Sequence, residues 1–416
     1  MRKIYTSIDI GSDTIKFVVA ELISNQMHVL ASNCIKSKGV RKGLIFDPNL
    51  TINAIKDGIK EINEDLGINI KKVIVNIASY EAKFMLVNGS VSIKDVNGIV
   101  NYEDVSHVIK ESVYAKLDSD YELVTVLPLE FMVDDKESGL KPTGLVGKKL
   151  SVKGIMISVP KKNVYSVLDV VEQAGLEVVD ITLSGLGDYY EVKNDNLDKK
   201  VGLIINLGHE TTTVSVINKG VLMNTDVVSL GGLNIDKDLS YVFGISVFDG
   251  RNLKEKFASS HKRFCQLNET YEIKNSLGER LKLNQLEVSE VVMSRMREIF
   301  EYARKKALSL TKQEINYIII TGGLTEIKSF KNLAFEFFGK GVIIYTENTL
   351  GVRDNKYTSA LGMLKYFHNK MDERGHDYSM LDMEDEQILI TPDTKTKNNT
   401  IISKFIENFI ASKEEK

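Results

Sequence analysis

The sequence is poor in the residues that mark several classes of protein. It has only two cysteines and no tryptophan among 416 residues. Cys34 and Cys265 are distant in sequence and show no CxxC or Cys/His spacing, so we expect neither a disulfide framework nor a zinc site. A formal net charge of −3 lacks the basic excess of nucleic-acid-binding proteins and argues against nucleic acid as a partner.

Long apolar segments are also missing. The first residues lead directly into an alternating strand that contains Asp9, which is unlike a signal peptide, and no apolar run is long enough to span a bilayer. We therefore expect a cytoplasmic protein whose contact with a membrane is peripheral. The composition is otherwise ordinary for a folded protein, with 43% hydrophobic and 27% charged residues. The length has room for roughly two to four domains.

A short pattern that occurs twice is the most informative feature present. Residues 8–14 read IDIGSDT and residues 205–211 read INLGHET, and an apolar strand pattern follows each copy. Each copy indicates a strand, an acidic or amide residue, a glycine turn and a second strand. A repeat at this scale predicts a duplicated α/β fold with a ligand cleft between its halves.

The first half is expected to be α/β and to be interrupted once. We assign it residues 1–80 and 161–195, with a helix over residues 48–66 and a buried strand over residues 72–78. Between these segments, the pattern of residues 81–160 is different and predicts strands, one helix and a Gly/Pro turn. We interpret that stretch as an inserted α+β subdomain.

The second half is expected at residues 196–370, with a smaller subdomain at about 225–305. It contains a long charged helical pattern over residues 286–308 and a doubly buried strand over residues 315–321. Residues 371–398 follow with many acidic side chains and few helix or strand signals. We expect them to form a disordered acidic linker.

The glycine turns have the residues of a phosphate site. Backbone N–H groups in such a turn can cup phosphate oxygens, and Gly11 and Gly208 leave the clearance that this needs. Asp9 is placed to hold Mg²⁺ through water, and Lys16 to reach a phosphate. A plain hairpin is the alternative for either turn alone, and a plain turn is the alternative for Gly322–Gly323 after its buried strand. The pairing of two such turns favours the phosphate site.

The chain ends in an amphipathic pattern, which we expect to form a helix over residues 399–413. One half of its helical wheel is apolar. A helix of this kind at the end of an acidic tether lies in a membrane interface, docks on a protein groove or folds back on its own domain, and the long tether favours the membrane. The expected membrane-facing residues are Ile401, Ile402, Phe405, Ile406, Phe409 and Ile410.

These motifs together resemble the actin/Hsp70/sugar-kinase ATPase superfamily, and within it the FtsA family of bacterial cell-division proteins. Residues 9–16, 206–212, 321–323 and 360–362 are similar to its phosphate-1, phosphate-2, adenosine and closing motifs. The narrower resemblance covers residues 4–368, includes the position of the insertion, and is carried by Gly39 to Gly43, Leu140 to Leu150, Gln173 to Leu176, Leu230 to Gly232, Arg295 and Glu298 to Ile299.

The resemblance implies an actin-like, ribonuclease-H-like ATPase fold that binds ATP and Mg²⁺. It places Asp9 and Asn206 at the catalytic positions, and Asp9 also at the metal. The cofactor-binding residues that it implies are Gly11, Ser12, Asp13, Thr14, Lys16, Gly208, His209, Thr211, Thr212, Lys254, Gly322, Gly323 and Leu324.

Three departures from the family pattern bear on catalysis. Asn206 stands where much of the superfamily has a second aspartate, and an amide lacks the negative charge that helps to bind hydrated Mg²⁺. Arg251, before Lys254, stands where a ribose-binding glutamate is common in the family. His209 and Glu210 replace small residues near the phosphates. We therefore expect ATP binding with at most weak hydrolysis.

The resemblance also implies partners. It implies a protein that polymerises and tethers the FtsZ ring to the inner face of the cytoplasmic membrane at the division septum, with other division proteins as further contacts. The acidic FtsZ tail is expected at a basic set on the helix at residues 286–308, for which a solvated, internally paired helix face is the alternative. That set comprises Arg295, Arg297, Arg304, Lys305 and Lys306.

Two other functions remain open on this scaffold. A sugar-kinase-like phosphotransferase would need a catalytic base, and the sequence offers no clear candidate. A pilus-assembly-type actin-like ATPase would bind a cytoplasmic peptide of a membrane protein and would not need the terminal amphipathic helix.

Overall fold

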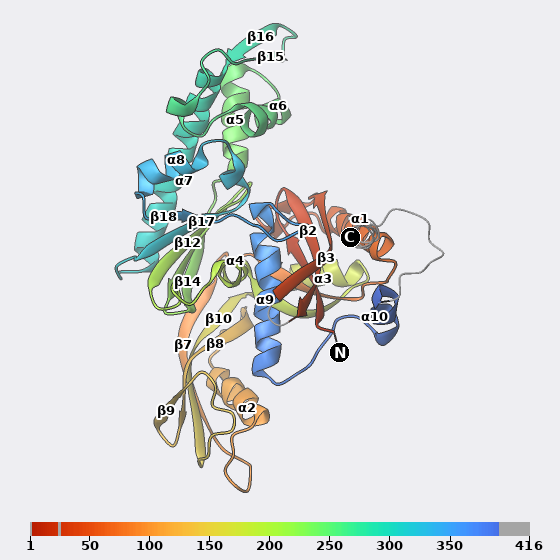
Figure 1. Cartoon of the computed structure of the whole chain (residues 1–416), viewed down its shortest axis with the longest axis vertical. Helices are drawn as coiled ribbons and strands as arrows, with labels where there is room; N and C mark the ends of the chain where they lie inside the picture. Colours follow the sequence, from red (N-terminus) through yellow and green to blue (C-terminus); the bar gives the residue numbers. More distant parts are fainter. Residues whose placement is uncertain (1, 24–25, 391–416) are drawn as a thin grey trace, which may run out of the picture.

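The computed structural model describes residues 2–23 and 26–390. Figure 1 shows two α/β units side by side, with a smaller unit below them and another above. Each α/β unit is built on a five-stranded mixed sheet. In the part of the chain that the structure describes, no helix is both long and apolar enough to cross a membrane.

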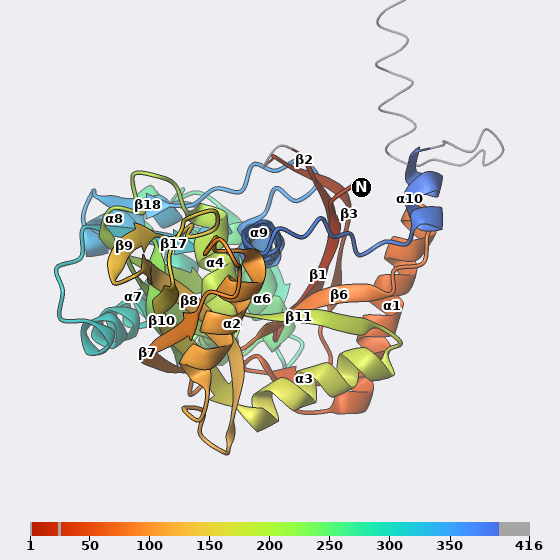
Figure 2. The same cartoon turned by 90° about the horizontal axis from the view of Figure 1, so that it is seen from below.

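The sheet of the first half holds the first glycine turn between its central strands. β1 pairs with β2 antiparallel and with β6 parallel, and all seven residues of β1 are buried. Ile4 and Ile8 pack on the side of α1 and α3, and Tyr5 packs on the side of α9 (Figure 2). The sheet order is β11 (Glu177–Leu183), β6 (Lys72–Ile77), β1 (Ile4–Ile10), β2 (Thr14–Ile23) and β3 (Gln26–Lys36), with helices α1 (Pro48–Leu66), α3 (Lys161–Gln173) and α9 (Thr358–Glu373).

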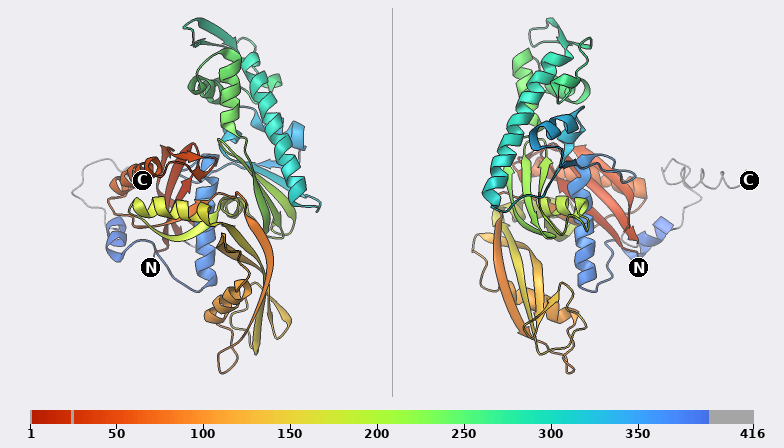
Figure 3. Two further views of the ribbon diagram at one scale, coloured as in Figure 1. Left: turned by 180° about the vertical axis from the view of Figure 1, so that it is seen from behind. Right: turned by 60° about the vertical axis from the view of Figure 1, so that its left-hand side comes forward.

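The second sheet repeats the first. β12 pairs with β13 antiparallel and with β17 parallel, so it takes the place that β1 has in the first sheet. Helix α7 packs on one face and α4 on the other, and Figure 3 shows α7 running along the side of this half. The order is β14 (Val221–Val228), β13 (Thr212–Asn218), β12 (Val201–Leu207), β17 (Tyr317–Thr321) and β18 (Val342–Ile344), with α4 (Ser184–Val192) and α7 (Gln285–Leu310). The predicted duplication is confirmed.

Two smaller units extend the halves. The insertion is an antiparallel sheet with its own apolar core, which confirms the expected α+β subdomain; its strands and helix are β7 (Lys83–Ser92), β10 (Lys149–Pro160), β8 (Tyr121–Val133), β9 (Lys136–Gly139) and α2 (Tyr102–Val113). The unit above the second half comprises α5 (Gly232–Phe243), α6 (Val247–Asn252), η1 (Leu253–Phe257), η2 (Lys262–Phe264), β15 (Thr270–Lys274) and β16 (Arg280–Asn284). The remaining elements are β4 (Val40–Arg41), β5 (Leu44–Ile45), η3 (Gly323–Glu326), α8 (Phe330–Phe338), η4 (Asn355–Tyr357) and α10 (Met383–Ile390).

Local sequence signals set the bounds of α1, which match those predicted. Asp47 accepts a hydrogen bond from the backbone N–H of Leu50, and Pro48 occupies the first helical position. Gly67 ends the helix in the left-handed conformation at φ 68°. The buried residues between these ends, such as Ile55 and Ile62, lie on one face and pack against the first sheet.

The two halves are joined where helices α4 and α9 cross. A Cβ atom built at Gly362 of α9 would overlap the carbonyl oxygen of Gly187 in α4 and would lie 2.9 Å from the backbone nitrogen of Glu191. The helices are therefore in backbone contact, which only glycine allows here. This crossing sets how the two sheets face each other.

The prediction of a flexible linker from residue 371 is wrong for its first part. Met371 and Met380 are buried against the first half, and the backbone N–H of Met380 donates to Ile4 at 2.9 Å. Apolar side chains spaced among the acidic ones provide this packing, which net charge alone does not reveal. Residues 391–398 of the expected linker, and the expected amphipathic helix at residues 399–413, lie outside the described residues.

Candidate functional site

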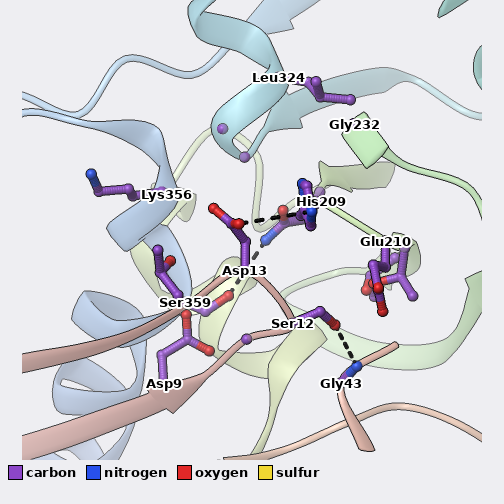
Figure 4. A pocket seen from close by; sticks show the side chains of 18 of the residues that line it. Asp9, Ser12, Asp13, Gly43, His209, Glu210, Gly232, Leu324, Lys356 and Ser359 are labelled. Atoms are coloured by element: carbon purple, nitrogen blue, oxygen red, sulfur yellow. Dashed lines mark hydrogen bonds and ion pairs between the residues drawn. The ribbon is translucent and has the colours of Figure 1, made fainter. Parts of the chain in front are cut away.

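A cavity of about 430 Å³ lies between the two halves. Both glycine turns open onto it, and Figure 4 shows side chains of the two turns around it. All the residues expected to bind the cofactor line this cavity except Thr212, and so do Asp9 and Asn206. The duplicated pattern therefore does bring its two copies to one place.

The two turns have the same backbone geometry. In the first, the N–H of Gly11 donates to the carbonyl of Thr14 at 3.1 Å; in the second, the N–H of Gly208 donates to the carbonyl of Thr211 at 2.9 Å. A Cβ atom at either glycine would lie 2.9 Å from that carbonyl oxygen. A side chain would therefore force both turns open, so glycine is required at each.

Thr212 is the one expected cofactor residue that the structure places elsewhere. It is fully buried, and its hydroxyl donates to the carbonyl of Leu230 at 2.9 Å. Thr213, the next residue of β13, lines the cavity instead. Successive residues of a strand point to opposite faces, so a shift of one position exchanges the buried residue for the exposed one.

Asp9 and Lys16 form a pair at the base of the first turn. They are directly opposite each other in the β1–β2 register, and Lys16 Nζ lies 2.9 Å from Asp9 Oδ2. Both side chains are about nine-tenths buried and line the cavity. The site therefore carries a neutralised pair here, with a carboxylate and an ammonium both available to an anionic ligand or its counter-ion.

An ion pair crosses the cavity from the first turn to the second half. Arg251 of α6 donates to both carboxylate oxygens of Asp13, at 2.6 and 2.8 Å. Lys36 of β3 reaches the same carboxylate from within the first half. Burial alone would raise the pKa of Asp13, but the hydrogen bonds from Arg251 and Lys36 outweigh it and hold that pKa well below its usual range.

The two residues that follow Gly208 also face the first half. His209 Nε2 lies 3.7 Å from Asp13, and Figure 4 shows this contact. Burial lowers the pKa of His209 to about 4, so its ring is neutral at pH 7. The Glu210 carboxylate accepts a hydrogen bond from the backbone N–H of Lys42, which is a second connection across the cavity. Glu210 is thus engaged with the chain of the opposite half.

Lys254 lines the cavity, but its ammonium is already paired. Its Nζ lies 2.7 Å from Asp236, and both side chains are at least 96% buried, with 4% and 1% exposed. The same nitrogen donates to the carbonyl of Gly232 at 3.3 Å. Lys254 therefore fixes the wall of the cavity around Gly232 as well as adding positive potential to it.

The sequence analysis missed Asp188 and Ser359, which adjoin the second turn. Asp188 of α4 is buried, and its Oδ1 accepts hydrogen bonds from Asn206 at 2.8 Å and from the Ser359 hydroxyl. Burial raises the pKa of Asp188 to about 7, and the two hydrogen bonds oppose that shift. Asp188 directly follows Gly185-Leu186-Gly187, and Ser359 directly precedes the motif at residues 360–362, but nothing in the sequence places either residue beside the second turn.

The basic set on α7 is largely occupied by internal ion pairs. Arg295 donates to Asp238 at 2.5 and 2.9 Å and also contacts Glu298, while Arg297 contacts Glu336. Lys306 forms an ion pair with Asp226 at 2.6 Å. The other two members lie against aromatic rings: Arg304 over the Phe337 ring at 5.3 Å and Lys305 near the Tyr302 ring at 5.4 Å. The internally paired alternative thus describes Arg295, Arg297 and Lys306.

Sequence comparison finds one family along the chain. The family model described as "Cell division protein FtsA" matches residues 203–362, and that described as "SHS2 domain inserted in FTSA" matches residues 81–158. The chain is 28% identical over 369 residues to the cell division protein FtsA of Enterococcus hirae, covering 88% of this chain and 83% of the relative. For the Bacillus subtilis protein of the same name, identity is 26% with the same coverages.

Solved structures show the same fold at low sequence identity. A structure titled "PilM-PilN type IV pilus biogenesis complex" matches with a TM-score of 0.59 and 12% identity, covering 86% of this chain and 97% of that chain. MreB5 of Spiroplasma citri bound to ADP matches with a TM-score of 0.54 and 13% identity, covering 90% and 98%. The predicted actin-like ATPase fold is confirmed.

Proposed function

Because the chain belongs to the FtsA family of cell division proteins, we propose that it binds ATP between its halves and tethers FtsZ filaments to the cytoplasmic membrane. The observation that carries the nucleotide part is the convergence of the two glycine turns on one cavity. Two sets of backbone N–H groups on opposite sides suit the several oxygens of a triphosphate. An MreB5 structure of the same fold contains ADP, which supports this assignment.

The residues around the cavity fit a nucleotide and its metal. Asp9 is the carboxylate next to the first turn that we assign to Mg²⁺ through water, and Lys16 is the cation that we assign to the phosphates. A Cβ atom at Gly323 would meet nothing within 4 Å, so the turn that begins at Gly322 leaves room for the base and ribose. When bound, Mg²⁺ neutralises charge on the β- and γ-phosphates.

We propose that turnover is weak. Asn206 stands at the end of β12, where its amide holds a hydrogen bond to Asp188 and carries no charge of its own. A general base needs a free acceptor within hydrogen-bond reach of the attacking water. Asp9 faces Lys16, and His209 and Glu210 are engaged across the cavity. The site is therefore better suited to holding a nucleotide than to hydrolysing it.

The ion pair between Asp13 and Arg251 is expected to slow nucleotide release. Arg251→Ala removes a bidentate, charge-assisted pair that spans the cavity, so release should become roughly tenfold faster. Stopped-flow displacement of a fluorescent ATP analogue measures this rate. Lys36→Ala is the matched control, because Lys36 contacts the same carboxylate from within one half, and release should change by less than about twofold. Equal release rates for the two variants would contradict a role for the ion pair that spans the cavity.

The same pair gives a pH dependence with a defined sign. Arg251 and Lys36 lower the pKa of Asp13. The contribution of the ion pair is therefore complete above the ordinary aspartate pKa of about 4 and is lost as the pH falls from there through the lowered pKa of Asp13. The difference in release rate between the wild-type protein and Arg251→Ala should therefore persist from pH 7.5 to pH 5.

The membrane part of the proposal depends on the terminal segment. The six apolar residues from Ile401 to Ile410 offer a gross gain of roughly 1.5 to 3 kcal/mol each on burial, which the cost of ordering the helix partly offsets. A single copy should therefore bind lipid only moderately, and copies joined in a filament should bind far better through effective concentration. Polymerisation and membrane attachment would reinforce each other, and the protein would then lie at the septum on the cytoplasmic face.

Deleting residues 395–416 is expected to abolish flotation with liposomes. The matched control deletes only residues 411–416, which keeps all six apolar side chains and should float like the full chain. Sedimentation through a density gradient separates bound from free protein. If the protein that lacks residues 395–416 floats as well as the full chain, the tether hypothesis is contradicted.

For the FtsZ tail, Arg304 and Lys305 are the proposed contacts on α7. They lie beside the rings of Phe337 and Tyr302, respectively, and no carboxylate of the described residues is paired with them by an ion pair. An acidic peptide would gain charge-assisted hydrogen bonds from these two side chains without first breaking an internal ion pair.

A further inference from the structure

Asp188 is a buried carboxylate next to the second glycine turn, and among the described residues no ion pair joins it to a cation. Its side chain is 1% exposed, and its Oδ2 has no hydrogen-bond partner among the described residues. Its Oδ1 accepts from Asn206 and Ser359, and both of these donors line the cavity. A buried carboxylate in this state needs a positive charge or a proton nearby.

A second buried carboxylate on the same helix, Glu191, does have a cationic partner. Glu191, one turn further along α4, is 6% exposed and also has one oxygen without a hydrogen-bond partner. Its other oxygen, however, lies 2.7 Å from Lys365 Nζ and accepts from the Tyr345 hydroxyl at 2.9 Å. Glu191 is therefore neutralised inside the protein, whereas the direct neighbours of Asp188 are an amide and a hydroxyl.

The two copies of the hairpin differ in the same way. In the first copy, Asp9 is opposite Lys16 and pairs with it. In the second copy, the equivalent Asn206 is opposite Thr213, which supplies no cation. An aspartate at position 206 would meet the Asp188 carboxylate at hydrogen-bond distance with no positive charge between them. The asparagine at 206 and the aspartate at 188 therefore form a matched pair that carries one negative charge.

We propose that Asp188 supplies the negative charge of the second hairpin and acts through Asn206 on the cation that accompanies the bound phosphates. This inference rests on the proposed nucleotide site and makes Asp188 a positioning residue. An ionised carboxylate only accepts hydrogen bonds, so it holds the Asn206 amide nitrogen toward α4. The Asn206 Oδ1 is thereby turned toward Gly322, where a Cβ atom would collide with it, on the wall of the cavity.

The test moves the charge between the two positions. Asp188→Asn, Asn206→Asp and the double variant are compared with Glu191→Gln, which removes a buried charge from the same helix away from the cavity. Calorimetric titration of ATP at pH 8, with and without Mg²⁺, gives the gain in affinity due to the metal. Thermal unfolding without nucleotide gives the effect on the fold.

The expected results separate charge from packing. Asp188→Asn should lower the Mg²⁺-dependent gain in ATP affinity about tenfold, because one negative charge near the metal is lost. Asn206→Asp should lower the unfolding midpoint because two carboxylates meet, and the double variant should restore both quantities toward the wild-type values. Glu191→Gln should leave the Mg²⁺-dependent gain within about twofold.

Two results would overturn the inference. One is a Mg²⁺-dependent gain in Asp188→Asn equal to that of the wild-type protein; the other is a double variant no better than the worse single variant. If the wild-type protein itself binds no ATP, the proposed function fails. The unfolding midpoints then still decide whether positions 188 and 206 share one charge.

Discussion

Replacing Gly322 by alanine is expected to weaken ATP binding on the order of 100-fold, because it displaces one wall of the cavity. Gly322 has a φ of +94°, and a Cβ atom there would lie 2.6 Å from the carbonyl oxygen and 2.7 Å from the nitrogen of Leu207. Both are backbone atoms of β12, the strand that leads into the Gly208 turn. They can yield only if the strand and its turn move. Calorimetric titration with Mg²⁺ and ATP measures the loss.

Gly339 offers a close control for this substitution. It ends α8 with φ 90° and ψ 165°, almost the conformation of Gly322 at φ 94° and ψ 164°. A Cβ atom at Gly339 would meet nothing within 4 Å. Gly339→Ala therefore has the same conformational cost without the collision, and its ATP affinity should stay within about twofold of the wild-type value. Equal losses in the two variants would show that the close approach to β12 does not matter.

Replacing Gly362 by valine is expected to give the largest loss of stability, at least about 3 kcal/mol in the free energy of unfolding. The new side chain would have to enter the backbone contact between α9 and α4, where a Cβ atom already overlaps Gly187. The helices must separate, and the two sheets that they join must shift. Urea unfolding followed by circular dichroism measures the change, and ATP affinity should fall with it.

Gly341→Val is the control for the helix crossing. Gly341 lies just before β18, and a Cβ atom there would meet nothing within 4 Å. Its substitution should change stability by less than about 1 kcal/mol. A Gly362→Val protein as stable as this control would mean that α4 and α9 do not determine how the halves face each other.

Two of the three departures of this chain from the family pattern, Asn206 and Arg251, face an aspartate. Asn206 hydrogen-bonds to Asp188, and Arg251 pairs with Asp13. Each of these two residues therefore has a partner at hydrogen-bond distance, but only the pair of Arg251 and Asp13 joins opposite charges.

Contiguous motifs were predictable from the sequence. The two glycine turns each lie within seven residues, so the strand and the turn follow from local rules, and Asp9, Gly11 and Gly208 line the cavity. The helix at Pro48–Leu66 was also predictable, because its cap, its proline and its final glycine are local signals.

Contacts between distant segments were not predictable. Asp188 and Ser359 join the site from two helices whose crossing depends on tertiary packing. Thr212 is buried and Thr213 lines the cavity, which the sequence could not show because a turn does not reveal which face of the next strand is buried. The segment around Met380 was misjudged because its acidic composition hides a few apolar anchors.

The most direct test of the central claim is a crystal structure of the protein with Mg²⁺ and a non-hydrolysable ATP analogue. We expect phosphate oxygens within hydrogen-bond distance of backbone N–H groups in both turns, at residues 11–14 and at residues 208–211. A nucleotide bound elsewhere, or held by one turn only, would contradict the account.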